Sequence, residues 1–165
     1  MRAERDRRDD EVREYFAARA QSMRRTAYVV VRDWHTAEDM VQLTFLQLYT
    51  HWPRIRRETV DGYARRTLVN QCLSHLRKHR RENPTDVMPD GHSVDPVPGL
   101  DTARTLAVLP PQQRAIVALR FLDDLPVAEV AAALGIAEGT VKSQTSRALA
   151  TLRKHVPHLE LEETR

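Results

Sequence analysis

Apolar residues recur every three to four positions through most of the first 81 residues, a spacing that places them on one face of a helix. The pattern predicts three helices, over 11–32, 37–52 and 63–81. The second helix is apolar on more than one face, which indicates burial against its own domain on one side and a second surface on the other. Thr36 is expected to cap the N-terminus of this helix, and Pro53 ends it.

A second group of shorter helices is expected towards the C-terminus. Apolar segments of helical spacing occupy 102–109, 111–121, 127–134 and 138–155. Apolar residues make up 41% of the chain, which is enough for a core, while glycine and the aromatic residues that favour strands are few. The predicted fold class is therefore all-α.

The segment 82–101 separates the two groups of helices. It holds four of the nine prolines and two of the five glycines. Proline prevents helix formation, and so few large apolar side chains cannot form a core. We therefore expect two small helical domains, 8–81 and 102–156, joined by a flexible, acidic, proline-rich linker over 82–101.

The charge along the chain changes sign where this linker begins. Residues 62–81 contain six basic and no acidic residues, whereas 82–101 contain five acidic residues and no Lys or Arg; the net charge is only +3. The basic block indicates either a solvated helix face or a surface for a polyanion. The chain has no apolar run long enough to cross a bilayer and no secretory signal, so we expect a cytoplasmic protein without a membrane partner.

Candidates for catalysis or metal binding are weak. The single cysteine, Cys72, lies in an apolar stripe and is expected to be a small core residue. His75 and His79 are four residues apart, but Leu76 stands where a zinc peptidase would place glutamate. Basic neighbours would also repel a cation. We therefore predict no catalytic residue, no metal and no cofactor.

The segment 127–155 has the spacing of a helix-turn-helix motif. Ala131 provides a small residue where two helices cross, Gly135 the positive φ of the turn, and Val141 the apolar anchor of the second helix. The other face of that helix presents hydroxyl, amide and basic groups, which are suited to phosphates and purine edges. These candidate DNA-binding residues are Thr140, Lys142, Ser143, Gln144, Ser146 and Arg147.

Two stretches together resemble the extracytoplasmic-function sigma factors, the small two-domain promoter-recognition subunits of bacterial RNA polymerase. The first is TAEDMVQLTFLQLY at 36–49, and the second is LPPQQRAIVALRFLDDLPVAEVAAALGIAEGTVKSQTSRAL at 109–149. Their order, on either side of an acidic linker, makes the resemblance specific. It covers roughly 10–155 and implies that the chain directs core polymerase to promoters and initiates transcription.

The resemblance also implies roles for matching positions in the first half. A docking surface for the clamp helices of the polymerase's largest subunit falls on Asp39, Gln42, Leu43 and Phe45. The connector 54–61 matches the loop that captures a flipped base of the −10 element, and a basic block at the end of the third predicted helix would lie along phosphates. The residues implied in −10 binding are Arg54, Arg56, Arg57, Tyr63, Arg66, Asn70, Arg77 and Lys78.

In the second half, the resemblance places Lys142, Ser143, Ser146 and Arg147 against the −35 element. The implied partners are core polymerase, through its clamp helices and its flap, and promoter DNA. An anti-sigma factor is a common partner in the family, although no residue here requires one. The chain departs from the family at Leu43, where glutamate is usual, and in the connector, which lacks an aromatic residue that some members carry.

Two functions from other classes remain as alternatives. A conventional helix-turn-helix regulator would dimerise through its N-terminal half and bind a symmetric site without polymerase. A metal-dependent nuclease is the second alternative, but the sequence offers no glycine-rich phosphate loop and no activated nucleophile. Binding to core polymerase and promoter-dependent transcription distinguish a sigma factor from both.

Overall fold

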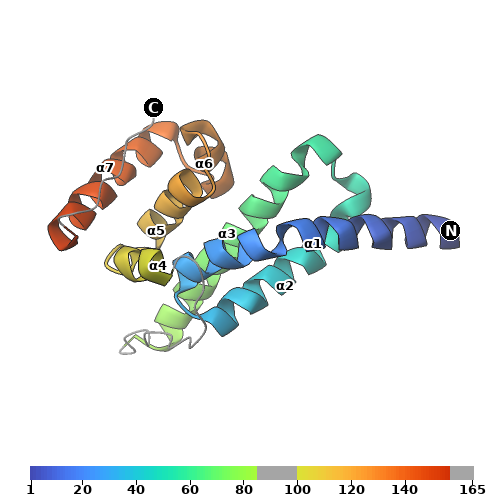
Figure 1. The fold of residues 1–165 in the computed structure, drawn as a ribbon, viewed down its shortest axis with the longest axis horizontal. Coiled ribbons are helices and arrows are strands. Elements are labelled where there is room, and N and C mark those ends of the chain that lie inside the picture. The colour runs from blue at the N-terminus through green and yellow to red at the C-terminus, as the bar shows by residue number, and fades with distance from the viewer. Residues whose placement is uncertain (85–99, 157–165) are drawn as a thin grey trace.

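The structure is a computed structural model that describes residues 1–84 and 100–156. Every regular element in these ranges is helical (Figure 1), so the predicted all-α fold class is confirmed. Most of the predicted linker, 85–99, and the C-terminal tail, 157–165, lie outside the described residues. The limits of the two predicted domains therefore stay a prediction.

Three long helices form the N-terminal half, and all three predicted helices are confirmed. They are α1 (Arg2–Val31), α2 (Trp34–His51) and α3 (Val60–Glu82). The chain reverses direction between successive helices, which lie side by side as a bundle (Figure 1). The connector between α2 and α3 contains two short 3₁₀ turns, η1 (Trp52–Arg54) and η2 (Arg57–Thr59). None of the helices in the described ranges is long and apolar enough to cross a membrane.

The first turns of α1 extend beyond the end of the bundle (Figure 1). Burial begins only at Val12. Tyr49, near the end of α2, holds these turns: Arg8 Nη2 donates to its hydroxyl at 2.9 Å, and the hydroxyl donates to Asp9 Oδ1 at 2.7 Å. The Arg8 guanidinium also lies over the Tyr49 ring, 4.5 Å from its centre, so a cation–π contact supports the hydrogen bonds.

The start of α2 differs from the prediction, in which Thr36 was the N-cap. The cap is Asp33, whose extended backbone (φ −136°) precedes the helix and whose carboxylate accepts from the Thr36 backbone N–H at 2.8 Å. The Thr36 hydroxyl donates to the same carboxylate at 2.6 Å. These hydrogen bonds lower the pKa of Asp33, although burial acts in the opposite direction. The prediction failed because Arg32 takes a left-handed conformation (φ 63°), which ends α1 early enough for α2 to begin at Trp34.

Shorter helices make up the C-terminal half, as predicted. They are α4 (Leu100–Leu106), α5 (Pro111–Val117), α6 (Val127–Leu134) and α7 (Glu138–His155). The helix predicted to run to residue 121 changes after Val117 into a π-helical turn, η3 (Ala118–Leu122). The last two helices have the bounds that the sequence predicted.

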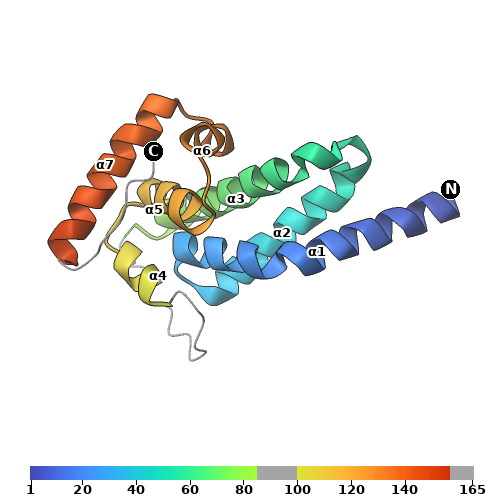
Figure 2. The same ribbon diagram turned by 45° about the horizontal axis from the view of Figure 1, so that its top comes forward.

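The two halves pack against each other, which the sequence did not predict. Figures 1 and 2 show the C-terminal helices at the end of the bundle where α1 ends and α2 begins. There α5 and η3 lie against α1, and α6 lies against α3. Buried side chains from both halves form one hydrophobic core, which includes Leu68 and Leu119. Cys72 is fully buried in this core, as predicted, and burial raises the pKa of its thiol to about 12.

One buried arginine joins the halves directly. Arg114 of α5 is only 6% exposed. Its Nε and Nη2 donate to the Val30 carbonyl at the end of α1, at 3.1 and 2.8 Å, while Nη1 donates to the Leu109 carbonyl at 2.7 Å. Burial, assisted by the charge of Arg32, lowers the pKa of Arg114 to about 10, so the guanidinium stays charged at neutral pH. The positive charge therefore sits at the C-terminal end of a helix dipole, where it is favoured.

Replacement of Asp33 by Ala should lower the free energy of unfolding by about 1 kcal/mol, because the first turn of α2 loses its cap. Urea denaturation followed by circular dichroism measures this change. The control is Asp39→Ala, at an exposed site on the same helix, which should change stability by less than about 0.5 kcal/mol. Equal losses in the two variants would contradict the assignment of the cap.

Candidate nucleic-acid interface

The helix-turn-helix predicted from the sequence is present in α6 and α7. Gly135 ends α6 with φ 65°, in the left-handed region that glycine adopts without strain. The next N–H, of Ile136, donates to the Ala131 carbonyl at 3.1 Å and closes the turn. Ala131 and Val141 are buried, as expected for the crossing residue and the anchor. The predicted spacing of the motif is therefore confirmed.

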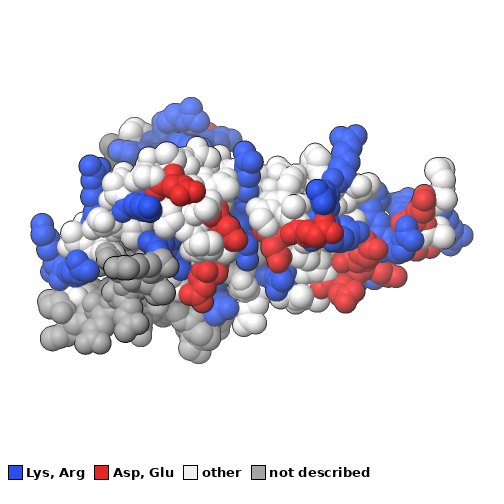
Figure 3. All heavy atoms as spheres, turned by 90° about the horizontal axis from the view of Figure 1, so that it is seen from above, with Lys and Arg blue, Asp and Glu red and all other residues white. Residues whose placement is uncertain are grey.

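The predicted recognition face of α7 is open to solvent. Five of its six residues are exposed, whereas Gln144 is half-buried and its Oε1 accepts from Gln113 Nε2 at 2.9 Å. Within the described ranges, neither Lys142 nor Arg147 forms an ion pair, so both charges are available to phosphates or base edges. In Figure 3, basic side chains stand out around the C-terminal half at the left, while acidic and basic ones are mixed over the start of α1 at the right. The exposed residues of this face are Thr140, Lys142, Ser143, Ser146 and Arg147.

Three of the residues implied in −10 binding line one surface cavity between α2 and α3. Tyr63, Arg66 and Asn70 surround it together with Gln47, and its volume is about 320 Å³. Tyr63, Arg66 and Asn70 are three and four positions apart on α3, so their side chains share a face of this helix. An aromatic ring, a guanidinium and an amide are the groups that stack on an unpaired base and bond its edge.

The other implied −10 residues do not reach this cavity. Arg57 turns towards α1, where it pairs with Glu11 and lies over the Trp52 ring, 4.3 Å from its centre. Arg54 and Arg56 are exposed on the connector, and Arg56 faces Glu58 at 3.7 Å. The remaining two residues, Arg77 and Lys78, are exposed on the last turns of α3.

The predicted docking residues of α2 divide into two groups. Asp39, Gln42 and Leu43 are exposed, and Leu43 is 43% accessible. Phe45 is only 8% accessible, because its ring packs edge-on against Phe16 with centres 3.9 Å apart. The Phe45 ring therefore lies in the hydrophobic core beneath α2. The sequence interpretation did not single out Leu46, which is 63% exposed beside Leu43. The excess of apolar residues in α2 was the feature of the sequence that could have indicated this exposed leucine.

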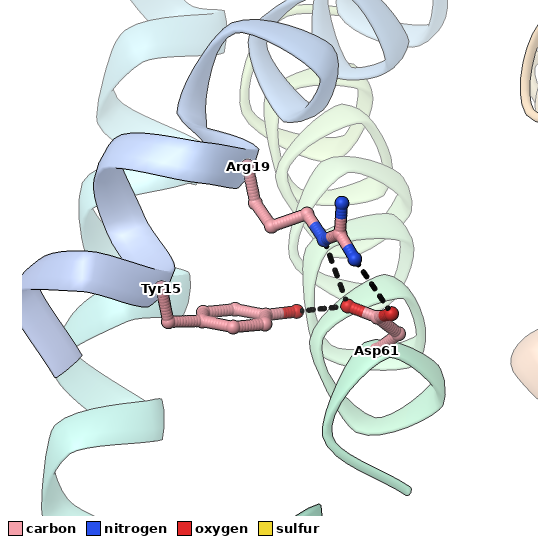
Figure 4. Close-up of polar contacts among 3 residues, drawn as sticks. All are labelled: Tyr15, Arg19 and Asp61. Atoms are coloured by element: carbon pink, nitrogen blue, oxygen red, sulfur yellow. Dashed lines mark hydrogen bonds and ion pairs between the residues drawn. The ribbon is translucent and has the colours of Figure 1, made fainter. Parts of the chain in front are cut away.

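The start of α3 is fixed by a cluster that the sequence did not reveal. Asp61, in the first turn of α3, accepts hydrogen bonds from two residues of α1 (Figure 4). The Tyr15 hydroxyl donates to Oδ1 at 2.7 Å, while Arg19 donates through Nε to Oδ1 at 3.0 Å and through Nη2 to Oδ2 at 3.1 Å. This bidentate pair anchors the end of the connector to α1. The residues lie 42 or more positions apart in sequence, so no local motif links them.

The pKa values in this cluster follow from its contacts. Burial acts to raise the pKa of Asp61, but the hydrogen bonds from Arg19 and Tyr15 outweigh it and the pKa is lowered. Burial, and then the hydrogen bond to the Asp61 carboxylate, raise the pKa of Tyr15. The carboxylate therefore stays ionised and the phenol stays protonated at neutral pH, which preserves all three hydrogen bonds.

Both halves match known protein families. Residues 16–82 match the model of sigma-70 region 2, and residues 100–152 match the model of sigma-70 region 4. The RNA polymerase sigma-E factor of Streptomyces avermitilis is 35% identical over 159 residues, which cover 92% of this chain and 88% of that protein. The chain belongs to the extracytoplasmic-function sigma factors. The resemblance expected from the sequence is therefore confirmed.

Further similar proteins agree with this family. The ECF RNA polymerase sigma factor SigM of Mycobacterium tuberculosis is 32% identical over 150 residues, with 87% of this chain and 76% of that protein covered. The sigma factor RpoE in its complex with the anti-sigma factor NepR, from Bartonella quintana, has the same fold: the TM-score is 0.79 at 23% identity, over 91% of this chain and 99% of that one. CnrH, in complex with the cytosolic domain of CnrY, gives a TM-score of 0.68 at 18% identity.

Asp61→Asn should lower the free energy of unfolding at neutral pH, because asparagine cannot form the charged pair with Arg19. Since the pKa of Asp61 is lowered in the folded protein, this stabilisation is fully present above the unfolded value of about 4. It is lost as the pH falls through the lowered value. The difference in urea midpoint between wild type and Asp61→Asn should thus be largest near pH 7 and shrink towards pH 2.

The matched control for this prediction is Asp10→Asn. Asp10 is an exposed aspartate whose pair with Arg13 is 3.5 Å long, and exposed pairs contribute little. The control should unfold with nearly the wild-type midpoint at every pH. A difference for Asp61→Asn that stayed constant from pH 7 to pH 2 would contradict the role assigned to its charge.

Proposed function

We propose that this sigma factor directs core RNA polymerase to promoters through two separate DNA contacts, one in each half of the chain. The observation that carries the proposal is the presence, in one chain, of an unpaired basic recognition face on α7 and of the cavity formed by Tyr63, Arg66 and Asn70. Each lies in the segment matched by the corresponding sigma-70 region. A regulator that acts without polymerase has no need of the second contact.

The upstream contact is assigned to α7. Its N-terminal turns would enter the major groove at the −35 element, as second helices of such motifs do. Lys142 and Arg147 carry free charges there, and the small hydroxyl side chains of Thr140, Ser143 and Ser146 allow close approach to phosphates. The Gln144 side chain can contact DNA only if its hydrogen bond with Gln113 breaks, so we assign it a smaller role in DNA binding.

The downstream contact is assigned to the cavity beside α3. A base taken out of the −10 element could stack on Tyr63 while Asn70 bonds its edge and Arg66 faces the phosphate. Unstacking a base costs a few kcal/mol, so this contact must be well positioned. The pair of Asp61 with Arg19 supports this arrangement, since it fixes the first turn of α3 immediately before Tyr63.

Polymerase docking is assigned to the exposed face of α2. Asp39, Gln42, Leu43 and the neighbouring Leu46 form a surface with two unburied leucines, which a partner helix can cover. We place the clamp helices of the largest subunit there and propose that the flap receives the C-terminal half. The solved structure of RpoE, which has the same fold, is a complex with the anti-sigma factor NepR, and we propose an anti-sigma factor as a further partner of this chain.

In this function the chain catalyses no reaction itself, since nucleotidyl transfer belongs to the polymerase, and its place of action is the cytoplasm. Run-off transcription with purified core polymerase tests the proposal: addition of the chain should produce transcripts from a promoter that core polymerase alone does not use. Binding to a symmetric DNA site as a dimer, without any transcript in this assay, would refute it.

The −35 assignment predicts that Lys142→Ala or Arg147→Ala weakens upstream binding by about 1–3 kcal/mol each where the contact is bidentate, and by less where it is a single phosphate. Footprinting of the holoenzyme over the −35 element measures the loss. Arg153→Ala, an exposed arginine nearer the C-terminus of α7, is the control for charge alone. An equal loss in all three variants would mean that α7 contributes only a general electrostatic attraction.

The −10 assignment predicts that Tyr63→Ala lowers promoter opening by about 1–3 kcal/mol, which is the contribution of one stacked base. Permanganate reactivity of −10 thymines measures opening, and the −35 footprint should be unchanged. Tyr63→Phe keeps the ring and should open promoters nearly as well as wild type. If the phenylalanine variant failed to the same extent as the alanine variant, stacking could not be the role of this side chain.

A further inference from the structure

The connector between α2 and α3 joins the two helices that form the proposed base-binding cavity. It starts at Trp52, directly after His51, whose ring centre lies 6.3 Å from that of Tyr63 in the cavity wall. It ends at the first turn of α3, the helix that carries Tyr63. The connector residues, 52–59, therefore lie beside the position assigned to a base that stacks on Tyr63.

The middle of the connector has little packing of its own. Two short 3₁₀ turns form its ends, and Ile55 and Arg56 between them have extended backbones. The second turn, η2, packs against α3. A hollow of about 600 Å³ lies between the connector and the first turns of α1, and Ile55 and Arg57 are among the residues that line it. Segments with so few packed contacts move among conformations unless specific interactions fix them.

One side chain of α1, Glu11, joins the two sides of this hollow. Its Oε2 accepts from Trp52 Nε1 at 3.0 Å, and the same oxygen pairs with the Arg57 guanidinium. The guanidinium in turn lies over the Trp52 ring, 4.3 Å from its centre. The hydrogen bond from Trp52 lowers the pKa of Glu11, so the carboxylate is ionised at neutral pH. Glu11 therefore holds the connector at two points, Trp52 and Arg57.

The two points depend on Glu11 to different degrees. Trp52 is only 4% exposed, and its ring also packs near Tyr15, with centres 5.8 Å apart. The Arg57 side chain is 50% exposed, and Glu11 is its one ion-pair partner within 1–84 and 100–156. Loss of the Glu11 carboxylate should therefore release Arg57 and its neighbours in the connector, while the core of the bundle remains intact.

This support comes from outside the segment that matches the family. The match to sigma-70 region 2 begins at residue 16, so it includes the connector but not Glu11. Arg57, for which the resemblance implied contact with DNA, is engaged by this support and turned towards α1. The role of Glu11 therefore follows from the contacts in this structure and not from the family match.

We propose that Glu11 is a positioning residue for −10 recognition: it holds the connector in one conformation through Trp52 and Arg57, and so sets the base preference of the adjacent cavity. Arg57 acts through this contact and not on DNA. A connector that moves among conformations places different groups beside the captured base, so the preferred base loses its advantage over the other three. This inference rests on the proposed function, because it requires that the cavity receives a base of the −10 element.

The first measurement follows the connector in the free chain. The chain has two tryptophans, so in a Trp34→Phe background the fluorescence reports on Trp52. Glu11→Ala should raise the acrylamide quenching constant and move the emission to longer wavelength, because the Trp52 ring loses its cover by Arg57. The matched control is Glu14→Ala, an exposed glutamate three positions further along α1, which should leave both values unchanged. Equal quenching in the two variants would overturn the proposal.

The second measurement is base discrimination by the holoenzyme. Run-off templates carry each of the four bases in turn at every −10 position, and the ratio of transcript from the best base to that from the next best is the discrimination. Glu11→Ala should lower this ratio about two- to tenfold at the captured position, the effect of one hydrogen bond. Glu11→Gln, which can still accept from Trp52, should lower it less, and Glu14→Ala should keep the wild-type ratio. A wild-type ratio in Glu11→Ala would also overturn the proposal.

Arg57→Gln separates positioning from a direct contact with DNA. Loss of a phosphate contact would reduce the slope of log affinity against log salt by about one, whereas loss of a positioning contact leaves the slope unchanged and lowers base discrimination. The double variant Glu11→Gln/Arg57→Gln should discriminate no worse than Arg57→Gln alone, because both changes break the same pair. A reduced slope or additive losses would contradict the role assigned to Glu11.

Failure of the proposed function gives a different result. In that case no holoenzyme, including the one with the wild-type chain, would produce a promoter-dependent transcript. The quenching measurement would still show whether Glu11 holds the connector.

Discussion

The guanidinium of Arg114 lies in the interior of the molecule, with carbonyl oxygens as its hydrogen-bond partners. A charge in such a place is tolerated only where other groups replace its lost hydration. The end of α1 supplies them, because the last carbonyls of a helix have no partner within the helix. The Val30 carbonyl and the Arg114 side chain therefore satisfy each other, and the position of α5 relative to the bundle follows from this contact.

A negatively charged carboxylate at the start of α3 is likewise stabilised by hydrogen bonds from neighbouring groups. Asp61 lies in the first turn of the helix, where negative charge is favoured, and it receives hydrogen bonds from Tyr15 and Arg19 of α1. The contact between Arg114 and Val30 joins the two halves of the chain, and the contacts of Asp61 join α3 to α1 within the N-terminal half. Both the connector and the C-terminal half are therefore attached to α1.

Features that depend on short stretches of sequence were predicted well. The helix-turn-helix has its expected bounds because Ala131, Gly135 and Val141 act within eleven residues, through packing and φ alone. The burial of the Phe45 side chain could not be predicted in the same way. Its helix is apolar on two faces, and only the position of Phe16 decides which apolar face is inside. Likewise, the choice of Asp33 over Thr36 as cap depended on the residue at which α1 ends.

The sequence by itself determined the helical fold, the exposed polar and basic face of α7, and the family, since these follow from residue spacing and local conformation. It also placed Tyr63, Arg66 and Asn70 on one face of α3, although the cavity that they share with Gln47 needed α2 beside them. Only the tertiary structure decided that the two halves are joined. The contacts that join them, from Arg114 to Val30 and from Thr26 to Asp123, span more than 80 residues. Hydrophobic period and capping signals act within a few helical turns, so they carry no information on partners so distant.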